Sequence, residues 1–171
     1  MNHTHLDRLV RGDGPGKTIH LLAATASDAY DLARKASDLP APRTVARVVR
    51  GTSCRTARAL FAEFAAAWQF PPYFGANWDA LDECLADLDW LPAAAHVLMV
   101  LDAPALLADE GPEAFRLFLD LVAGVAAERA APGRKGGVHP APFRVVLQAE
   151  PADASAFANR LEAAGVEFDR L

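Results

Sequence analysis

Hydrophobic and polar positions along the chain follow two periods, one typical of strands and one typical of helices. Alternating or continuous apolar runs predict strands over residues 18–24, 45–50, 97–102 and 143–148, and a short final strand over 166–168. The run from Val97 to Leu101 is apolar at every position. Such a run is typical of a strand that is buried on both faces of a parallel sheet.

Helical spacing of the apolar residues predicts helices over residues 27–37, 53–68, 77–88, 111–130 and 153–164. Ser27 and Asn77 stand where a helix N-cap is expected, and Pro112 stands at a first-turn position that tolerates proline. Because strands alternate with helices, the sequence predicts an α/β fold, with a small, mostly parallel β-sheet packed with α-helices.

The length and composition predict one folded domain with a polar arm. A chain of 171 residues fits a single domain, and a domain of this size buries roughly 70% of its unfolded surface. Residues 1–16 are polar and rich in glycine, so we expect a loose N-terminal arm followed by one domain over 17–171. Residues 132–142 form a basic, glycine-rich stretch that predicts a loop.

The sequence favours a cytoplasmic location. Its start has neither a positive region nor an apolar core of the kind that marks a secretory signal. The longest nearly apolar run, over residues 90–101, is too short to cross a bilayer. We therefore expect Cys54 and Cys84 to be reduced thiols.

Charge is distributed unevenly along the chain. The formal net charge is −5, yet residues 59–115 contain ten acidic residues and no Lys or Arg. That segment carries −10, and the other seventeen bases and twelve acids give the rest of the chain +5. Such a segment attracts a basic protein and repels nucleic acid and anionic membranes. We therefore expect a protein partner, with neither direct nucleic-acid nor membrane binding.

The helix predicted after Asn77 has an apolar face and an acidic face. Successive helical residues are about 100° apart, which puts four apolar residues on one side, where we expect the core. These are Leu81, Cys84, Leu85 and Leu88. Asp79 and Glu83 lie opposite them, Asp87 follows one turn on, and Asp82 lies at the flank. Like charges four residues apart cost a few tenths of a kcal/mol in an isolated helix, so the acidic face destabilises the helix slightly.

Two interpretations of the acidic face are open. In the simpler interpretation, the acidic face is only solvated and keeps the protein soluble. A binding face is favoured by Tyr73 and Phe74 in the preceding turn, since aromatic residues beside charged groups are typical of interface anchors. Two carboxylates one turn apart also imitate neighbouring phosphates of RNA, because Arg and Lys clusters bind both groups in the same way.

Residues 71–85 resemble the barstar (barnase inhibitor) family, whose motif is Pro-x-Tyr-aromatic-Gly-x-Asn-x-Asp-Ala-Leu followed by an acid, Cys and Leu. The resemblance is dense over 71–85 and looser over 45–148. It implies an inhibitor, not an enzyme, that occludes the active site of a small, basic, secreted ribonuclease and protects the bacterial cell that makes it. From the residues and the resemblance together, the expected partner-binding residues are Tyr73, Phe74, Gly75, Asn77, Trp78, Asp79, Asp82, Glu83 and Asp87.

The chain departs from the family's best-known member at three places. Glu83 is one methylene longer than the Asp which that member places in the enzyme's phosphate site. Asp82 stands where that member has a Trp. A Glu that it contributes from a later helix falls near Leu121 here, and Asp120 is the acid beside it. The resemblance therefore implies the inhibitory mode more closely than it implies the target.

Two other functions use the same face. One is a protein-binding or regulatory module that does not inhibit its partner. The other is a metal-dependent hydrolase in which Asp79, Asp82 and Glu83 would hold Mg²⁺ or act as an acid–base pair. The sequence marks no companion His, Lys or Ser for that chemistry, so we expect no catalytic residue, metal or cofactor.

Motifs for nucleotide or metal binding are weak elsewhere in the chain. Residues 12–18 resemble a phosphate-binding loop, but Gly12 is one residue too close to the Gly-Lys-Thr end, and a strand is predicted to follow. His3 and His5 lack a third ligand. Cys84 has no histidine partner in the sequence pattern, so we expect a small core residue there.

Overall fold

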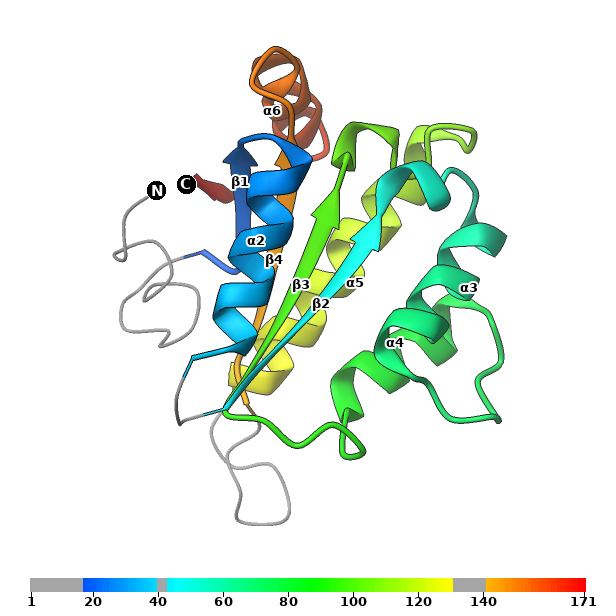
Figure 1. Ribbon diagram of the computed structural model, residues 1–171. Helices are drawn as coiled ribbons and strands as arrows, with labels where there is room; N and C mark the ends of the chain where they lie inside the picture. Colours follow the sequence, from blue (N-terminus) through cyan, green and yellow to red (C-terminus); the bar gives the residue numbers. More distant parts are fainter. Residues whose placement is uncertain (1–16, 40–42, 131–140) are drawn as a thin grey trace.

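The five strands form one sheet, in which every neighbouring pair is parallel (Figure 1). The structure is a computed structural model that describes residues 17–39, 43–130 and 141–171. Its strands are β1 (Ile19–Ala23), β2 (Thr44–Arg50), β3 (Ala95–Leu101), β4 (Phe143–Ala149) and β5 (Phe168–Arg170), in the spatial order β2-β3-β4-β1-β5. The α/β prediction is confirmed. The expected arm over 1–16 and most of the 132–142 loop lie outside the described residues.

The helices lie on both faces of the sheet, with one helix alone on one face (Figure 1). They are α2 (Ala26–Ser37), α3 (Ala57–Trp68), α4 (Trp78–Asp87), α5 (Pro112–Ala130) and α6 (Ala154–Ala163), with short 3₁₀ turns η1 (Gly51–Ser53) and η2 (Ala103–Ala105). The β1-to-β2 connection runs across the sheet in one direction, and the later connections run in the other. Because such crossovers are right-handed, α2 lies on one face and the other helices belong to the opposite face.

The core consists of two apolar clusters separated by the sheet. Side chains alternate between the faces of a strand, so Leu98 and Val100 of β3 enter the cluster beneath α3, α4, α5 and α6. Val97 and Met99 enter the smaller cluster beneath α2. Every residue of β3 is buried, as expected of its continuous apolar run. This strand follows α4 in the chain and lies between β2 and β4 in the sheet.

Two helices begin at residues other than those expected. The N-cap of α2 is Thr25 and not Ser27, because the Thr25 hydroxyl accepts from a first-turn amide at 3.1 Å. The predicted helix over 53–68 begins only at Ala57, where Thr56 is the N-cap. The preceding residues, Gly51–Ser53, form a separate 3₁₀ turn. Threonine hydroxyls that cap nearby amides decided both starts.

The last strand lies two residues later than expected. Instead of residues 166–168, it spans Phe168–Arg170. Its first residue pairs with Ile19, so β1 becomes an inner strand with β4 on one side and β5 on the other. Pairing with β1 set this register, and the short sequence pattern could not show it.

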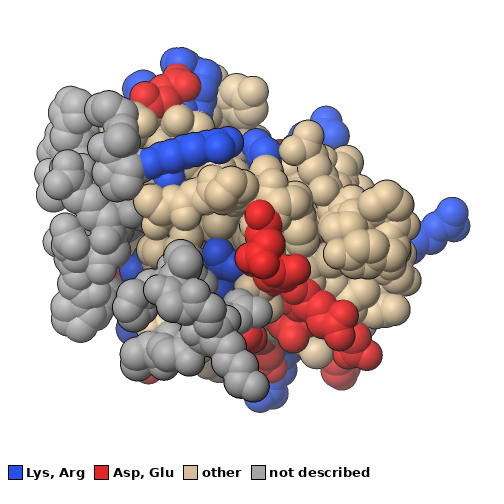
Figure 2. Space-filling view, turned by 90° about the horizontal axis from the view of Figure 1, so that it is seen from below, with Lys and Arg blue, Asp and Glu red and all other residues tan. Residues whose placement is uncertain are grey.

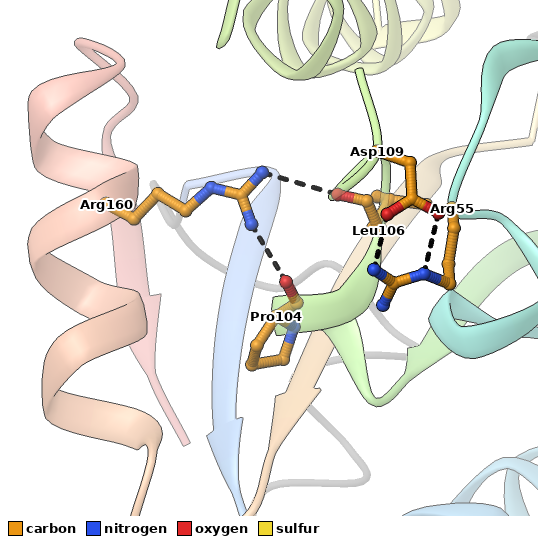
Figure 3. A network of polar contacts seen from close by, with 5 residues as sticks. All are labelled: Arg55, Pro104, Leu106, Asp109 and Arg160. Carbon is orange, nitrogen blue, oxygen red and sulfur yellow. Dashed lines mark hydrogen bonds and ion pairs between the residues drawn. The ribbon is translucent and has the colours of Figure 1, made fainter. Parts of the chain in front are cut away.

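Two arginines hold the segment that follows β3 (Figure 3). Arg160 of α6 donates to the carbonyl oxygens of Pro104 at 2.9 Å and Leu106 at 3.3 Å. Arg55 forms an ion pair with Asp109, with 2.8 Å between Nε and Oδ2. These contacts fasten the C-terminal edge of the sheet, at the opposite end of β3 from α4.

Gly51 lies where two backbone segments meet closely. A Cβ atom at this residue would stand 2.3 Å from the carbonyl oxygen of Asp102 and 3.1 Å from that of Leu101. Both obstacles are backbone atoms, which cannot rotate away as a side chain could. The contact lets the turn after β2 pack against the turn after β3.

We expect Gly51→Ala to lower the free energy of unfolding by about 1–3 kcal/mol or more, because the added methyl group forces the two turns apart. Urea denaturation measures this. Gly124→Ala is the matched control, since nothing lies within 4 Å of the position its Cβ would take in α5. That change should stabilise the protein by about 0.5–1 kcal/mol through helix propensity. Equal effects of the two substitutions would contradict the close contact at Gly51.

Candidate functional site

The turn before α4 separates an anchoring aromatic residue from an exposed one. Phe74 is half-buried; its ring lies 4.8 Å from that of Phe70 and 6.5 Å from that of Phe61, centroid to centroid. The amide of Phe74 donates to the carbonyl of Pro71 at 3.0 Å, which closes the turn. Tyr73 points outward and is 78% exposed. Phe74 therefore fastens the turn, and Tyr73 is the aromatic side chain that it presents to solvent.

Gly75 and Asn77 shape the path from the turn into the helix. The Asn77 side chain accepts from the amide of Ala80 at 2.8 Å, which confirms it as the N-cap of α4. Its amide nitrogen donates back to the carbonyl of Gly75 at 3.4 Å. A Cβ at Gly75 would lie 3.0 Å from that same nitrogen. Both residues are exposed, and the turn depends on their fit to each other.

Helix α4 has the two faces that its spacing predicts. Leu81, Cys84, Leu85 and Leu88 are buried. Asp79, Asp82, Glu83 and Asp87 are exposed. Figure 2 shows a band of acidic side chains on the underside of the molecule, where α4 lies. Trp78 is half-buried and packs edge-to-face on Phe61 at 5.0 Å, so it belongs partly to the anchor.

Negative charges crowd one another on this face. Partial burial raises the pKa of Asp82, and Glu128 of α5 raises it further, followed by Asp79 and Glu83. Among the described residues, Asp79, Asp82 and Glu83 form no ion pair. A cation bound at this face would relieve the repulsion.

The end of α4 is held by a residue that the sequence pattern did not single out. Arg129 of α5 is only 4% exposed, and it donates to the carbonyls of Ala86 at 2.9 Å and Asp87 at 3.1 Å. It also contacts Nδ1 of His96 in β3 at 3.0 Å. In the sequence, Arg129 is one of several charged residues near the end of an amphipathic helix. The one signal in the sequence is its spacing, which puts Arg129 on the same side of the helix as the buried residues Val122, Val125 and Ala126.

His96 is neutral in this arrangement. A guanidinium only donates, so Nδ1 accepts from Arg129 and the proton on Nε2 faces the carbonyl of Leu91 at 2.8 Å. Burial lowers the pKa of His96 to about 4, against the carbonyl of Leu91, which raises it. Arg129 lowers the pKa further, as do Arg47 and Arg43. A second positive charge at this place would therefore be costly.

The described residues do not assemble a metal or thiol site at the acidic face. No group of three His, Cys, Asp or Glu residues that could hold a metal occurs in the part of the chain that the structure describes. Burial raises the pKa of the Cys84 thiol, and Asp87 and Glu83 raise it further, so the thiol stays protonated. Cys84 is a core residue of α4, as expected.

The crevice where parallel sheets commonly bind ligands is bridged by the chain itself. The strand order puts the topological switch between β1 and β4. There Gln148 accepts from the amide of Asp102 and donates to the carbonyl of Ala24, both at 2.7 Å. Glu150 accepts from the amide of Ala26 at the start of α2, at 3.2 Å. A carboxylate of the protein thus occupies the helix N-terminus that would otherwise attract a phosphate.

The segment that resembles a phosphate-binding loop stands in the wrong order for one. Such a loop follows a strand and opens a helix. Here Lys17 and Thr18 lead directly into strand β1. The earlier part of the segment, residues 12–16, lies outside the described residues, as do His3 and His5.

Comparison with known proteins gives one family and a set of structures with a similar fold. The family described as "Barstar (barnase inhibitor)" matches residues 44–148. No curated protein matches the sequence. The match includes the turn, α4, Arg129 and His96. It leaves β1, α2, α6 and β5 outside, so the flanking segments supply an inner strand, an edge strand and the helix that covers the second face of the sheet.

The similar solved structures belong to much larger chains. The Aeropyrum pernix ORC2 protein, in ADPNP-ADP complexes, aligns with 98% of this chain and 44% of its own at 13% identity, with a TM-score of 0.61. A chain of Drosophila ORC bound to GC-rich DNA and Cdc6 aligns with 98% of this chain and 53% of its own at 11% identity, with a TM-score of 0.51. This chain spans about half the length of those proteins. At such identities the likeness concerns the fold alone.

None of the helices in the described ranges is both long enough and apolar enough to cross a membrane.

The buried histidines predict a loss of stability in mild acid. Below its ordinary pKa of 6.5, His96 takes up a proton in the unfolded chain but stays neutral in the folded one until the pH nears its folded pKa of about 4. We therefore expect the free energy of unfolding to fall by about 2 kcal/mol between pH 6.5 and about pH 5 from His96 alone. His20 acts in the same direction, because burial lowers its pKa as well.

Urea denaturation at a series of pH values measures this slope. His96→Asn keeps an acceptor near the position of Nδ1 but cannot take up a proton, so its slope should be shallower than that of the wild type. A wild-type stability that stays level over this range would contradict the neutral, buried state of His96.

Proposed function

Because the chain belongs to the barstar (barnase inhibitor) family, we propose that it binds a basic ribonuclease and occludes its active site with α4 and the preceding turn. The observation that carries the proposal is the exposed carboxylate face of Asp79, Asp82 and Glu83, which has no ion-pair partner among the described residues and lies beside the exposed Tyr73. We place this inhibitor in the cytoplasm of a bacterium that secretes the enzyme.

The proposed mechanism begins with the spacing of two carboxylates. Asp79 and Glu83 are four residues apart on one helix, so their Cβ atoms are neighbours at roughly 5–6 Å. Their carboxylates act as substitutes for phosphates of the RNA substrate. Arg, Lys or His side chains in the phosphate sites of the enzyme would bind them through charge-assisted hydrogen bonds. The enzyme would then hold a protein helix where its substrate belongs.

Rigidity of the platform supports tight binding. The turn is fixed on the core by Phe74 and Trp78, and the helix is capped at its start by Asn77. Little conformational freedom is therefore left to lose on association, which is the usual advantage of a preorganised site. Tyr73 adds a large exposed aromatic surface next to the acids, typical of a residue that carries much of the binding energy.

Long-range attraction is the third part of the mechanism. The excess of acidic residues over 59–115 creates a field that attracts a basic enzyme before contact. Salt screens such a field, so we propose that association is fast at low ionic strength and slows as salt is added.

The double substitution Asp79→Asn with Glu83→Gln tests the contact helix. We expect it to weaken binding to barnase, used as the test ribonuclease, by about 3 kcal/mol or more, because cations of the enzyme would be buried without partners. Titration calorimetry measures the affinity, and an RNA-cleavage assay measures inhibition. The matched control is Asp153→Asn with Glu162→Gln, which removes the same charge from exposed positions at α6.

The two readouts separate the candidate functions. Inhibition by the wild type and by the control, but not by the double variant, supports an inhibitor that uses α4. Binding with full ribonuclease activity would instead support a non-inhibitory module on the same face. If barnase does not bind, capture from the lysate and secreted fraction of the producing organism tests its own ribonucleases. Equal capture of one by both double variants would remove the functional role of the acidic face.

Tyr73→Ala tests the aromatic part of the site. The side chain is 78% exposed, so we expect the free energy of unfolding to change by no more than about 0.5 kcal/mol. Affinity for the ribonuclease should fall by about 2 kcal/mol, as for an anchoring aromatic residue at an interface. Tyr30→Ala is the control, because Tyr30 is 54% exposed on α2, which covers the other face of the sheet. Similar losses in both variants would contradict the assignment of Tyr73.

A further inference from the structure

Helix α4 needs support from outside itself. It has ten residues, and a helix of that length is marginal in water even with a favourable sequence. Asp79, Glu83 and Asp87 succeed one another at every fourth position, and like charges at that spacing repel. The acidic end also meets the negative pole of the helix dipole, which favours a cation there. The features that suit the helix to bind a basic partner therefore weaken it as a helix.

A buried cation stands at that end. The Nη1 atom of Arg129 donates to the carbonyls of Ala86 and Asp87, which belong to the last turn of α4. The Nε atom donates to the carbonyl of Ala141, just before β4, at 2.9 Å. The guanidinium therefore ties the end of α4 to α5 and to the start of β4. With 4% of its surface exposed, Arg129 is not itself available to a partner.

His96 fixes the direction of the guanidinium. Its Nδ1 accepts a hydrogen bond from Nη2 of Arg129 at 3.0 Å. Its Nε2 lies 2.8 Å from the carbonyl oxygen of Leu91, in the connection from α4 to β3. The other charged groups that act on His96 are Arg47 of β2 and Arg43 just before it, both positive. The ring of Trp68 in α3 lies 6.1 Å away. The neutral imidazole is thus the form that can accept from Arg129.

We propose that Arg129, oriented by neutral His96, is the positioning residue of the contact helix: it holds the last turn of α4 and so sets the aim of the acidic side chains. The proposal rests on the proposed function, since it concerns the same face. Without Arg129, the turn that follows Glu83 would fray, and Glu83 and Asp87 would lose their fixed relation to Asp79. The long-range charge of the face would remain.

Arg129→Met tests the proposal, with Arg160→Met as the matched control. Arg160 also donates to two backbone carbonyls, those of Pro104 and Leu106, but it does so at the opposite end of β3 (Figure 3). Both variants lose an arginine that fastens a backbone segment. Only the first loses the contact with α4, so effects confined to Arg129→Met report on positioning and not on stability in general.

The first readout is hydrogen exchange of the amides at the end of α4, which needs no partner. The amide of Leu88, which donates to the carbonyl of Cys84, is the reporter. We expect its exchange to be about 10- to 100-fold faster in Arg129→Met, as for the loss of hydrogen bonds from a charged group. Arg160→Met should leave it unchanged relative to global unfolding. Unchanged exchange in Arg129→Met would overturn the proposal.

The second readout is binding kinetics with barnase. We expect the dissociation rate to rise about tenfold in Arg129→Met, because the acidic side chains lose their fixed aim. The association rate should not fall, since removing a positive charge leaves the acidic field intact or stronger. A change in stability alone would move neither rate while the protein stays folded. Equal dissociation rates in the wild type and Arg129→Met would overturn the functional part of the proposal.

One further variant and one further probe keep the test decisive. If Arg129→Met does not fold, Arg129→Lys is used, which retains the charge but loses the planar fork. The Leu88 amide should then exchange faster than in the wild type, but by less than the roughly 10- to 100-fold expected for complete loss of the arginine contacts. If barnase does not bind, a hexa-arginine peptide serves as the cationic probe for the dissociation rate. Faster exchange at Leu88 without binding of either probe would uphold the role of Arg129 in the fold and count against the proposed inhibition. The two failures are therefore distinguishable.

Discussion

An α-helix that carries carboxylates on successive turns is opposed by their mutual repulsion, and the structure around α4 is arranged to overcome it. Asn77 closes the start of the helix through its side chain, and Arg129 holds the end through backbone carbonyls. Leu81 and Leu85, on the inner face of α4, are completely buried. Each of these contacts acts on the backbone or the core, which leaves Asp79 and Glu83 in solvent. The protein thereby keeps a concentrated negative charge on a rigid support.

The sheet makes that support possible. Residues 44–148, which match the barstar (barnase inhibitor) family, contain the three strands β2, β3 and β4 and the complete acidic site. The flanking segments add β1 beside β4, β5 beside β1, and α2 over the second face. In this arrangement β3 is buried along its whole length. His96, the second residue of that strand, is therefore held in a fixed place. The flanking helix α2 covers the face of the sheet that lies away from α4.

The proteins with a similar fold and the family that matches the acidic helix are different proteins. The solved structures of the Aeropyrum pernix ORC2 protein and of Drosophila ORC share the fold at low identity, and a fold alone does not specify a function. At the edge where such sheets commonly bind ligands, Gln148 and Glu150 of this chain bridge the neighbouring segments. The exposed acidic residues lie instead on α4. The helix and its turn, which lie within the family match, therefore carry the proposed function.

Local signals in the sequence were sufficient for the elements and for the outline of the site. The period of apolar residues predicted the α/β class, and Asn77 predicted the start of α4, because capping depends on residues three positions apart. The acidic face followed from helical spacing alone. Local patterns were insufficient for two helix starts: Thr25 and Thr56 are the N-caps, where the sequence pattern indicated Ser27 and a start at residue 53.

Contacts between distant segments were decided only by the tertiary structure. The sequence did not show that Phe74 would turn inward while Tyr73 points out, because that choice depends on the ring of Phe61 in another helix. It did not show that Arg129 would reach the end of α4, where its acceptor carbonyls lie forty-three and forty-two residues earlier in the chain, or that His96 would contact the same guanidinium. The sequence by itself thus determined which residues could carry charge to a partner. The packing of α5 and β3 against α4 decided how firmly that charge is held, because long-range burial and hydrogen bonding exist only in the folded chain.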